Sequence, residues 1–389
     1  MSIITSLLDC DLYKFNMLRV YFHHFSNMNA EFVFKCRNKH INFTKPMIDD
    51  IKNELNYLTQ LRFTKDEINY ISEIPYHKTA IGFLEFLRMY QLNPDYLTVI
   101  EENDNLSIRA KGPLFQVTMW EIYVLAIVQE VYWRHLYDTN TINNFMHKGY
   151  TKLLDDLKTI EPFTLVEFGT RRRFNKEYQE QILKYLIANC GEHLFGTSNV
   201  FLAMKYNIRS CGTMAHEYIC LGQGLNTVPI AESQRYMLDI WSKEYDGANG
   251  TALTDTLGMD KWEKDFTGRF AKLFDGVRHD SGDPIVWGMK MLLLYKKFGI
   301  DATTKYFMFS DNLDLIRVKH IQNHFKDRVK MSFGIGTSLT NNIPGITPLN
   351  NVMKMVSANN HPVAKISDEP GKTMCEDEKY LEYLRYTIK

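Results

Sequence analysis

The chain has 389 residues, 45% of them hydrophobic, which is enough for a large α/β domain with a smaller companion domain. Lysine plus arginine and aspartate plus glutamate both total 46, so no overall charge favours nucleic acid or an anionic membrane. The six cysteines include no C-x-x-C pair, which argues against a zinc ribbon or a disulfide framework. The first residues lack the features of a signal peptide, and the longest apolar stretch, 122–133, is too short for a membrane span. We therefore expect a soluble cytoplasmic protein.

Residues 1–130 mix helical and strand patterns without regular alternation. We predict a strand over residues 30–37, a helix over 81–90, a strand–turn–strand over 96–108 and a buried helix over 120–134. Together they predict an N-terminal α+β domain. Near its start, the run Asp9-Cys10-Asp11-Leu12-Tyr13-Lys14 is typical of a helix N-terminus with Asp11 as the cap.

From residue 163 the pattern changes to strand, loop and helix. The predicted elements, in chain order, are a strand at 163–168, helices at 176–189 and 200–205, a strand at 305–309, a helix at 313–325 capped by residues 310–312, and a strand at 329–333. This spacing predicts βα units, a parallel sheet and, over residues 131–349, an α/β barrel. Residues 350–389 contain a predicted hairpin of 352–356 and 363–366, and we expect them to join the N-terminal domain.

The segment 275–284, with the sequence DGVRHDSGDP, carries the strongest functional signal. We predict that it follows a strand at 270–274 and precedes a helix at 286–295, so that it lies where α/β folds bind ligands. Arg278 can bind phosphate, and Asp280 can hold sugar hydroxyls, a metal ion or a developing cation. These groups suit chemistry on a phosphorylated sugar. A turn with solvated charges is the alternative that this segment alone leaves open.

Three further loops offer related chemistry. Gly334, Gly336 and Thr337 end a predicted strand with the glycines and hydroxyl that phosphate loops use. Phe168 can stack on an aromatic ring, and Arg171 can pair with a carboxylate or phosphate. In the third loop, His216 stands beside Glu217, and Cys220 occupies the place of the second histidine of a zinc protease motif.

An imidazole oriented by a carboxylate can act as a nucleophile, so His216 is a candidate for that role. A structural role is the commoner one for an isolated histidine.

Taken together, eight motifs resemble nicotinate phosphoribosyltransferases in order and spacing, over most of the chain from about residue 6 to 384. They are DxYK, EFGTRRRF, GTSN, GTMAHE, RHDSGDP, FSDNLD, SFGIGT and PVAKISDEPGK. The resemblance implies formation of nicotinate mononucleotide and pyrophosphate from nicotinate and 5-phosphoribosyl-1-pyrophosphate, in NAD salvage, coupled to ATP hydrolysis through a phosphohistidine. It also implies an irregular barrel of seven or eight strands with an N-terminal α+β domain.

The resemblance assigns the phosphoribosyl donor to the C-terminal motifs. Asp280 is expected to hold the ribose hydroxyls, Arg278 the donor, and Asp311 a second ribose or phosphate contact. The residues expected to cradle the 5′-phosphate are Gly334, Gly336 and Thr337. Mg²⁺ is expected to arrive with the donor and ATP, and no metal site made by the protein itself is expected.

The resemblance assigns the pyridine ring to the N-terminal motifs. Phe168 and Tyr13 of the partner subunit are expected to sandwich the ring in a homodimer with shared sites. Arg171 would pair with the nicotinate carboxylate, Ser198 would lie near the ring, and His216 would be the phosphorylated histidine.

Four alternatives remain open at this point. A nicotinamide phosphoribosyltransferase shares the fold and chemistry, although the three arginines 171–173 favour an anionic ring. A quinolinate phosphoribosyltransferase would not need the histidine motif. A non-catalytic nucleotide sensor would be favoured by loss of His216, Arg278 or Asp280, and all three are present. An unrelated phosphosugar aldolase or isomerase would need a lysine or base at a strand end, and no lysine stands out there.

Overall fold

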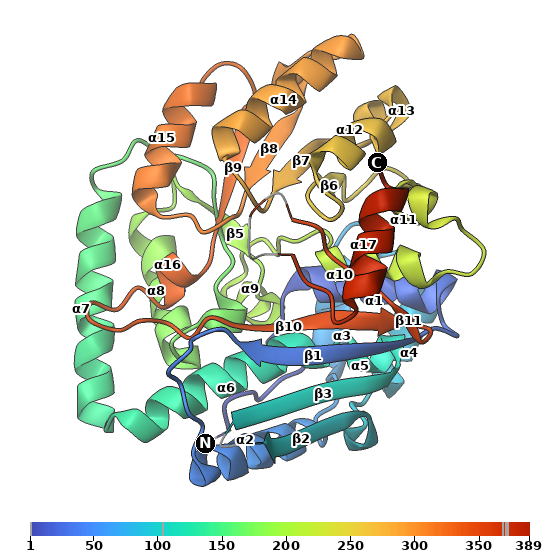
Figure 1. Cartoon of the computed structure of the whole chain (residues 1–389). Helices are drawn as coiled ribbons and strands as arrows, with labels where there is room; N and C mark the ends of the chain where they lie inside the picture. The colour runs from blue at the N-terminus through green and yellow to red at the C-terminus, as the bar shows by residue number, and fades with distance from the viewer. Residues whose placement is uncertain (1, 103–104, 368, 370–372) are drawn as a thin grey trace. The chain divides into compact units, whose positions relative to one another are not determined.

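The computed structural model describes residues 2–102, 105–367, 369 and 373–389 (Figure 1). The chain divides into two compact units. Unit 1 is made of Met1–Asn27, Glu31–Gly212 and Ile335–Lys354, and unit 2 of Met28–Ala30, Thr213–Gly334 and Met355–Lys389. Both units are discontinuous in sequence, and their bounds differ from the predicted ranges 1–130, 131–349 and 350–389. The division into domains at these ranges stays a prediction.

The N-terminal strands of unit 1 form an antiparallel sheet. Strands β2 (Leu97–Glu102) and β3 (Asn105–Pro113) pair in register from Leu97↔Ala110 to Glu102↔Asn105. Strand β3 also lies beside β1 (Asn29–Cys36), whose first two residues are counted in unit 2. The predicted strand–turn–strand is therefore confirmed, and its turn residues 103 and 104 lie outside the described part of the chain.

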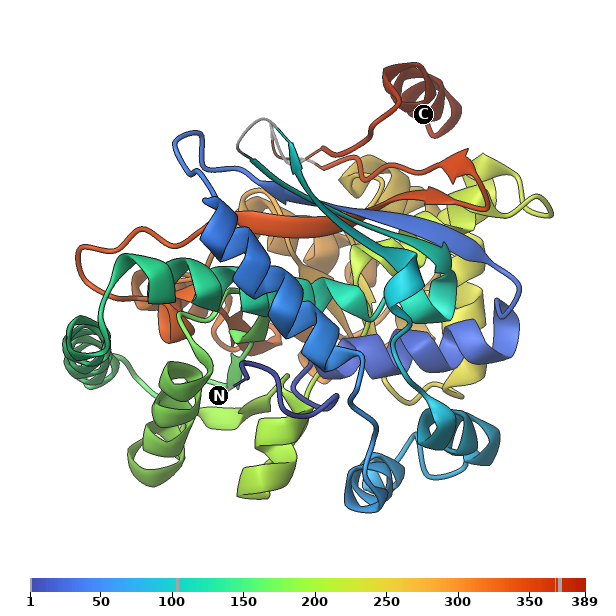
Figure 2. The ribbon, with the colours of Figure 1, turned by 90° about the horizontal axis from the view of Figure 1, so that it is seen from below.

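Helices make up most of unit 1. Helix α6 (Trp120–Leu136) has fourteen consecutive buried residues and packs against α2 (Lys45–Leu58) (Figure 2). The other α-helices of this unit are α1 (Leu12–His24), α3 (Lys65–Glu73), α4 (Ile81–Met89), α5 (Leu114–Val117), α7 (Thr139–Leu157), α8 (Lys176–Asn189), α9 (Val200–Tyr206) and α16 (Thr337–Thr340).

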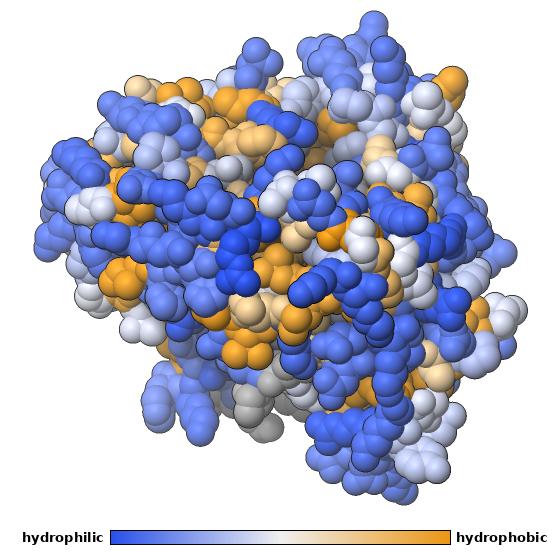
Figure 3. Space-filling model, turned by 90° about the horizontal axis from the view of Figure 1, so that it is seen from above, coloured by the Kyte–Doolittle hydropathy of each residue, from blue (hydrophilic) through white to orange (hydrophobic). Residues whose placement is uncertain are grey.

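One helical stretch among the described residues, Leu114–Leu136, is long and apolar enough to cross a membrane. Because 89% of its apolar window is buried inside the protein, we interpret it as a core helix. On the face drawn in Figure 3, hydrophobic residues lie in small groups among hydrophilic ones.

The first βα unit lies in unit 1. Strands β4 (Leu165–Glu167) and β5 (Leu194–Thr197) are parallel and are connected through α8. The strand at β4 and the helix α8 are as predicted, whereas β5 was not among the predicted strands. The side chain of Asn175 caps α8 by accepting a hydrogen bond from the Tyr178 N–H.

Unit 2 contains four parallel strands, which lie side by side in the order in which they follow one another along the chain. They are β6 (Thr251–Leu253), β7 (Gly276–His279), β8 (Tyr306–Phe309) and β9 (Lys330–Ile335), the last residue of β9 belonging to unit 1. Helix α14 (Pro284–Lys297) connects β7 to β8, and α15 (Leu315–Phe325) connects β8 to β9 (Figure 1). The predicted α/β class is confirmed, because the structure combines helices with a parallel sheet and an antiparallel sheet. Closure of a barrel stays a prediction.

Trp287 shows how the helices cover these strands, because its ring lies 5.0 Å from Phe307 and 5.5 Å from Phe309 of β8. The remaining helices of unit 2 are α10 (His216–Leu221), α11 (Ser233–Glu244), α12 (Met259–Asp265), α13 (Gly268–Leu273) and α17 (Glu378–Thr387).

Three local predictions are wrong. Residues 270–274 do not form a strand, because 270–273 belong to helix α13, and buried Phe270 lies one turn before the C-cap residue Phe274. Helix α15 is capped by Asp314, not by residues 310–312. The C-terminal hairpin and its first strand, β10 (Asn351–Ala358), are as predicted, but the second strand, β11 (His361–Pro362), is shorter and earlier than the predicted 363–366.

A buried ion pair ties the N-terminal segment of unit 1 to the loop after β4. The Arg173 guanidinium donates to both carboxylate oxygens of Asp9, at 2.7 and 2.9 Å, and both side chains are buried. Burial alone would raise the pKa of Asp9, but the charge and hydrogen bonds of Arg173, together with Lys176 and Asn199, outweigh it and lower the pKa below its usual value.

We expect Arg173→Ala to lower the free energy of unfolding by about 3–5 kcal/mol, because the buried Asp9 charge loses its closest positive partner and keeps only Lys176, 3.7 Å away. Urea denaturation followed by circular dichroism measures this. Arg235→Ala is the control, since Arg235 pairs with Glu232 in solvent and its loss should cost at most about 1 kcal/mol. Equal small losses for both variants would contradict the prediction.

Candidate active site

The register of the unit 2 strands brings polar residues to one edge. Leu253 is level with Arg278, and His279 is level with Phe309. The residues that follow these strand ends, Asp255 after β6, Asp280 after β7 and Ser310 after β8, therefore meet at the carboxyl edge of the sheet, where α/β folds bind ligands.

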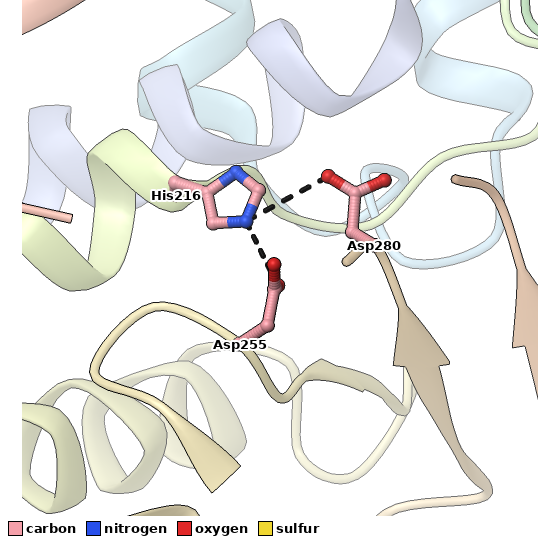
Figure 4. A group of neighbouring side chains, drawn as sticks. All are labelled: His216, Asp255 and Asp280. Carbon is pink, nitrogen blue, oxygen red and sulfur yellow. Dashed lines mark hydrogen bonds and ion pairs between the residues drawn. The ribbon is translucent and has the colours of Figure 1, made fainter. Parts of the chain in front are cut away.

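His216 lies between two of these carboxylates (Figure 4). It is the first residue of α10 and is buried, with 7% of its surface exposed. Its Nε2 is 2.8 Å from Oδ1 of Asp255 and 3.6 Å from Oδ2 of Asp280, while Nδ1 points away from both carboxylates. If Nε2–H donates to Asp255, the lone pair of the neutral ring is on Nδ1.

Asp255 joins three other segments. Besides His216, its carboxylate accepts hydrogen bonds from Ser281 Oγ at 2.6 Å and from Lys365 Nζ at 2.8 Å. Burial alone would raise the pKa of Asp255, but His216 and the Lys365 ammonium hold it well below its usual range. Asp255 therefore stays ionised and can orient the imidazole.

Asp280 and Arg278 form the second half of the group. Asp280 accepts a hydrogen bond from Ser310 Oγ at 2.8 Å, and its other oxygen is 3.5 Å from the Arg278 guanidinium. Against the effect of burial, the positive charges of Arg278 and His216 lower the pKa of Asp280 to about 2. Arg278 also donates to the Met214 carbonyl at 2.9 Å, so its orientation is fixed by the loop before His216.

His216 itself is held neutral. Burial is the largest cause, and with the positive charge of Lys365 it outweighs the two carboxylates and lowers the pKa of His216 to about 4. A neutral imidazole has a free lone pair at physiological pH, which a nucleophile requires.

The ligand atoms of His216, Asp255 and Asp280 lie within 4.8 Å of one another, close enough to hold a metal ion. The donor set does not suit Mg²⁺, which prefers oxygen ligands alone. In addition, Asp255 already accepts hydrogen bonds from Lys365 and Ser281. These residues fit an oriented histidine better than a magnesium site.

A second group of candidate residues lies in unit 1. Ser198 is buried and donates its hydroxyl to Asp11 at 2.7 Å, and its carbonyl accepts from the Leu12 N–H at 2.8 Å. Asp11 precedes α1, but its side chain makes no capping hydrogen bond. The predicted capping role is therefore wrong, and the carboxylate contacts the GTSN loop.

Arg171 adds charge to this group. Burial raises the pKa of Asp11, although Ser198 and the nearby Arg171 charge act in the opposite direction. Arg171, Phe168 and Tyr13 are half-buried, so each keeps part of its surface exposed.

The phosphate-loop candidates are divided between the units. Gly334 is a buried residue of β9 in unit 2, whereas Gly336 and Thr337 are half-buried in unit 1. A Cβ atom at Gly336 would lie 2.9 Å from the Phe168 carbonyl, so the chain approaches itself closely there. Asp311 is half-buried and follows β8 in unit 2.

Sequence reasoning missed two central residues of the unit 2 group. Asp255 follows a strand of only three residues, β6, whose sequence Thr-Ala-Leu is too short to stand out by alternation. Lys365 lies in the PVAKISDEPGK motif, but no pattern indicated its contact with Asp255. Residues 368 and 370–372 of that motif lie outside the described part of the chain.

Two family models match most of the chain. The model of the nicotinate phosphoribosyltransferase family matches residues 163–389, and the model of that family's N-terminal domain matches residues 8–129. The chain belongs to the nicotinate phosphoribosyltransferase family.

Individual members of the family match over their full length. A nicotinate phosphoribosyltransferase of Bordetella petrii is 44% identical over all of this chain and 99% of its own, and one of Chromobacterium violaceum is 42% identical over all of this chain and 97% of its own. The crystal structure of nicotinate phosphoribosyltransferase from Vibrio cholerae aligns with a TM-score of 0.90 and 34% identity, covering 100% of this chain and 94% of that one. The corresponding structure from Porphyromonas gingivalis gives 0.89 and 34%, covering 99% and 100%.

For this family member we expect the His216 ring to stay neutral from pH 8 down to about 5, since its pKa is about 4. Its folded pKa lies below the unfolded value, so this group takes stability away as the pH falls from about 6.5 towards 4. Lys365→Met should raise the His216 pKa by about one unit, because a positive charge is lost from the Asp255 carboxylate.

NMR titration of the ring carbon signals, assigned with His216→Ala, measures both values. A wild-type midpoint near 6.5, or no shift in Lys365→Met, would refute this electrostatic account.

Proposed function

We propose that the protein is a nicotinate phosphoribosyltransferase, which forms nicotinate mononucleotide and pyrophosphate from nicotinate and 5-phosphoribosyl-1-pyrophosphate for NAD synthesis. The observation that carries the proposal is the full-length match at 44% identity to a relative of that name. The presence of His216, Arg278 and Asp280 in one ordered group supports catalysis over a sensor that has lost its chemistry.

Arg278 and Asp280 are proposed to bind the phosphoribosyl donor. When pyrophosphate leaves C1 of the ribose, positive charge develops on the sugar, and the ionised Asp280 can hold the ring hydroxyls and stabilise that charge. Arg278 is a bidentate donor for phosphate oxygens. Asp311 is proposed as a second ribose or phosphate contact, and Gly334, Gly336 and Thr337 as ligands of the 5′-phosphate.

His216 is proposed to couple ATP hydrolysis to the transfer. Its neutral Nδ1 attacks the γ-phosphorus of ATP, a nitrogen–phosphorus bond forms, and the bond to ADP breaks; water later releases phosphate from the histidine. Asp255 holds Nε2–H and stabilises the positive charge that the ring gains.

Phe168, Arg171 and Ser198 are proposed to bind the nicotinate, with Phe168 stacking on the ring and Arg171 pairing with its carboxylate. A neutral amide would gain less from Arg171, so nicotinamide is the disfavoured substrate. Tyr13 of the partner subunit is proposed to complete the sandwich in a homodimer.

Three further features belong to this proposal. The first is a barrel of seven or eight strands. The second is Mg²⁺ bound to the phosphates of the donor and of ATP, where it would neutralise charge on the leaving pyrophosphate. The third is a cytoplasmic location.

Product formation from nicotinate, phosphoribosyl pyrophosphate and Mg²⁺, with and without ATP and with nicotinamide in parallel, tests the proposal. We expect nicotinate mononucleotide in preference to the amide product, with a higher yield and ADP release when ATP is present. Absence of product from either base would refute catalysis and favour a sensor.

His216→Ala should abolish ADP release while leaving slow transfer without ATP, because the nucleophile is lost and the donor contacts remain. Coupled assays of ADP and of nicotinate mononucleotide measure the two activities. His320→Ala, a change at an exposed histidine of α15, is the matched control and should leave both unchanged. Undiminished ATPase activity in His216→Ala would exclude the phosphohistidine.

A further inference from the structure

Glu167 is a buried carboxyl group that the proposed chemistry does not use. It is the last residue of β4, directly before Phe168, and none of its surface is exposed. Such a group needs strong hydrogen-bonding partners to be tolerated in the interior. Its partners come from the two loops that carry the candidate nicotinate-binding residues, the loop of Phe168 and Arg171 and the loop of Ser198.

The carboxylate of Glu167 accepts hydrogen bonds on both oxygens. Oε1 accepts from the Gly169 N–H at 2.5 Å, and Oε2 accepts from Thr197 Oγ1 at 2.5 Å. The Gln179 side-chain amide of α8 lies 3.1 and 3.2 Å from the two oxygens. Gly169 belongs to the loop of Phe168 and Arg171, and Thr197 directly precedes Ser198.

We infer that Glu167 is a positioning residue that fixes the loop of Phe168 and Arg171 against the loop of Ser198. The inference rests on the proposed function, because it assumes that these three residues bind nicotinate. Because none of its surface is exposed, Glu167 acts on the site through Gly169 and Thr197.

Gly169 is held from both sides. Its N–H donates to Glu167, and its carbonyl accepts from Thr340 Oγ1 at 3.1 Å. A Cβ at this position would lie 2.6 Å from Glu167 and closer still to Thr340, so the backbone has no room for another residue there. The start of the loop is therefore fixed by direct contacts.

The hydrogen-bond pattern requires that both side-chain oxygens of residue 167 act as acceptors. The Gly169 N–H and the Gln179 amide are donors, and Thr197 Oγ1 itself accepts from the Asn199 N–H, so its own hydrogen is free for Glu167. The Gln179 amide nitrogen is near both oxygens, so a glutamine at position 167 would place its NH₂ group against this donor in either orientation. Glu167→Gln thus keeps the shape and breaks the pattern.

Burial and nearby charges shift the pKa of Glu167. Burial is the largest cause that raises its pKa, to about 6, and the Asp11 charge adds to this against the effect of the hydrogen bonds. Arg173 is the positive group that interacts with Glu167 from the following loop.

The test compares Glu167→Gln and Thr197→Val with Glu177→Gln, a control at an exposed position of α8. Thr197→Val removes one donor to Glu167 at nearly constant volume and is the milder change. Steady-state kinetics gives KM for nicotinate and for phosphoribosyl pyrophosphate separately, and circular dichroism checks folding. We expect the nicotinate KM to rise about tenfold or more in both variants, the size of effect of one mispaired buried hydrogen bond, with the donor KM changed by less than about twofold.

An unchanged nicotinate KM in a folded variant, or equal rises in both KM values, would overturn the inference. Failure of both variants to fold beside a folded control would also overturn it, since Glu167 would then serve the fold in general. A wild-type protein that forms no product would instead refute the proposed function.

Discussion

The candidate site of unit 2 depends on the carboxylate of Asp255. This one group accepts hydrogen bonds from His216, Ser281 and Lys365, which lie up to 149 positions apart along the chain between residues 216 and 365. Burying the carboxylate without these donors would cost folding free energy, and without the carboxylate the Lys365 ammonium would lose the acceptor of its hydrogen bond. The orientation of the imidazole is therefore fixed by the same contacts that make the carboxylate tolerable in the interior.

Unit 1 uses buried carboxylates in a comparable way. Asp9 accepts a hydrogen bond from Arg173, Asp11 accepts one from Ser198, and Glu167 accepts from Gly169 and Thr197. In each pair an acid inside the fold fixes a loop that follows a parallel strand. Loops are the most mobile part of most folds, so buried ionic and hydrogen-bonded contacts of this kind are what give a loop a defined geometry.

Much of this could be predicted from the sequence, because strand-end loops rich in glycine, arginine and aspartate are local signals. Helix α8 was predicted with its observed bounds, and Arg278, Asp280 and His216 meet in one group as the motifs indicate. Residues 270–274 were misread because an i, i+4 pair of buried phenylalanines in a short segment fits a strand pattern as well as a helix.

Asp255 and Lys365 could not be found this way. Their importance comes from a contact between distant segments, and neither residue has a local pattern that separates it from an ordinary surface charge. For Asp11 the local signal was misleading, because a helix N-terminus satisfies the same sequence pattern whether or not the side chain caps it.

The charges in the unit 2 group explain why its histidine is neutral. Asp255 and Asp280 supply two negative charges, and Lys365 and Arg278 supply two positive charges, so the four side chains balance before His216 is counted. A proton on the imidazole would add an uncompensated positive charge in a buried place, which agrees with a His216 pKa of about 4. The charges of this group therefore hold the His216 imidazole neutral, and the contact with Asp255 fixes its orientation.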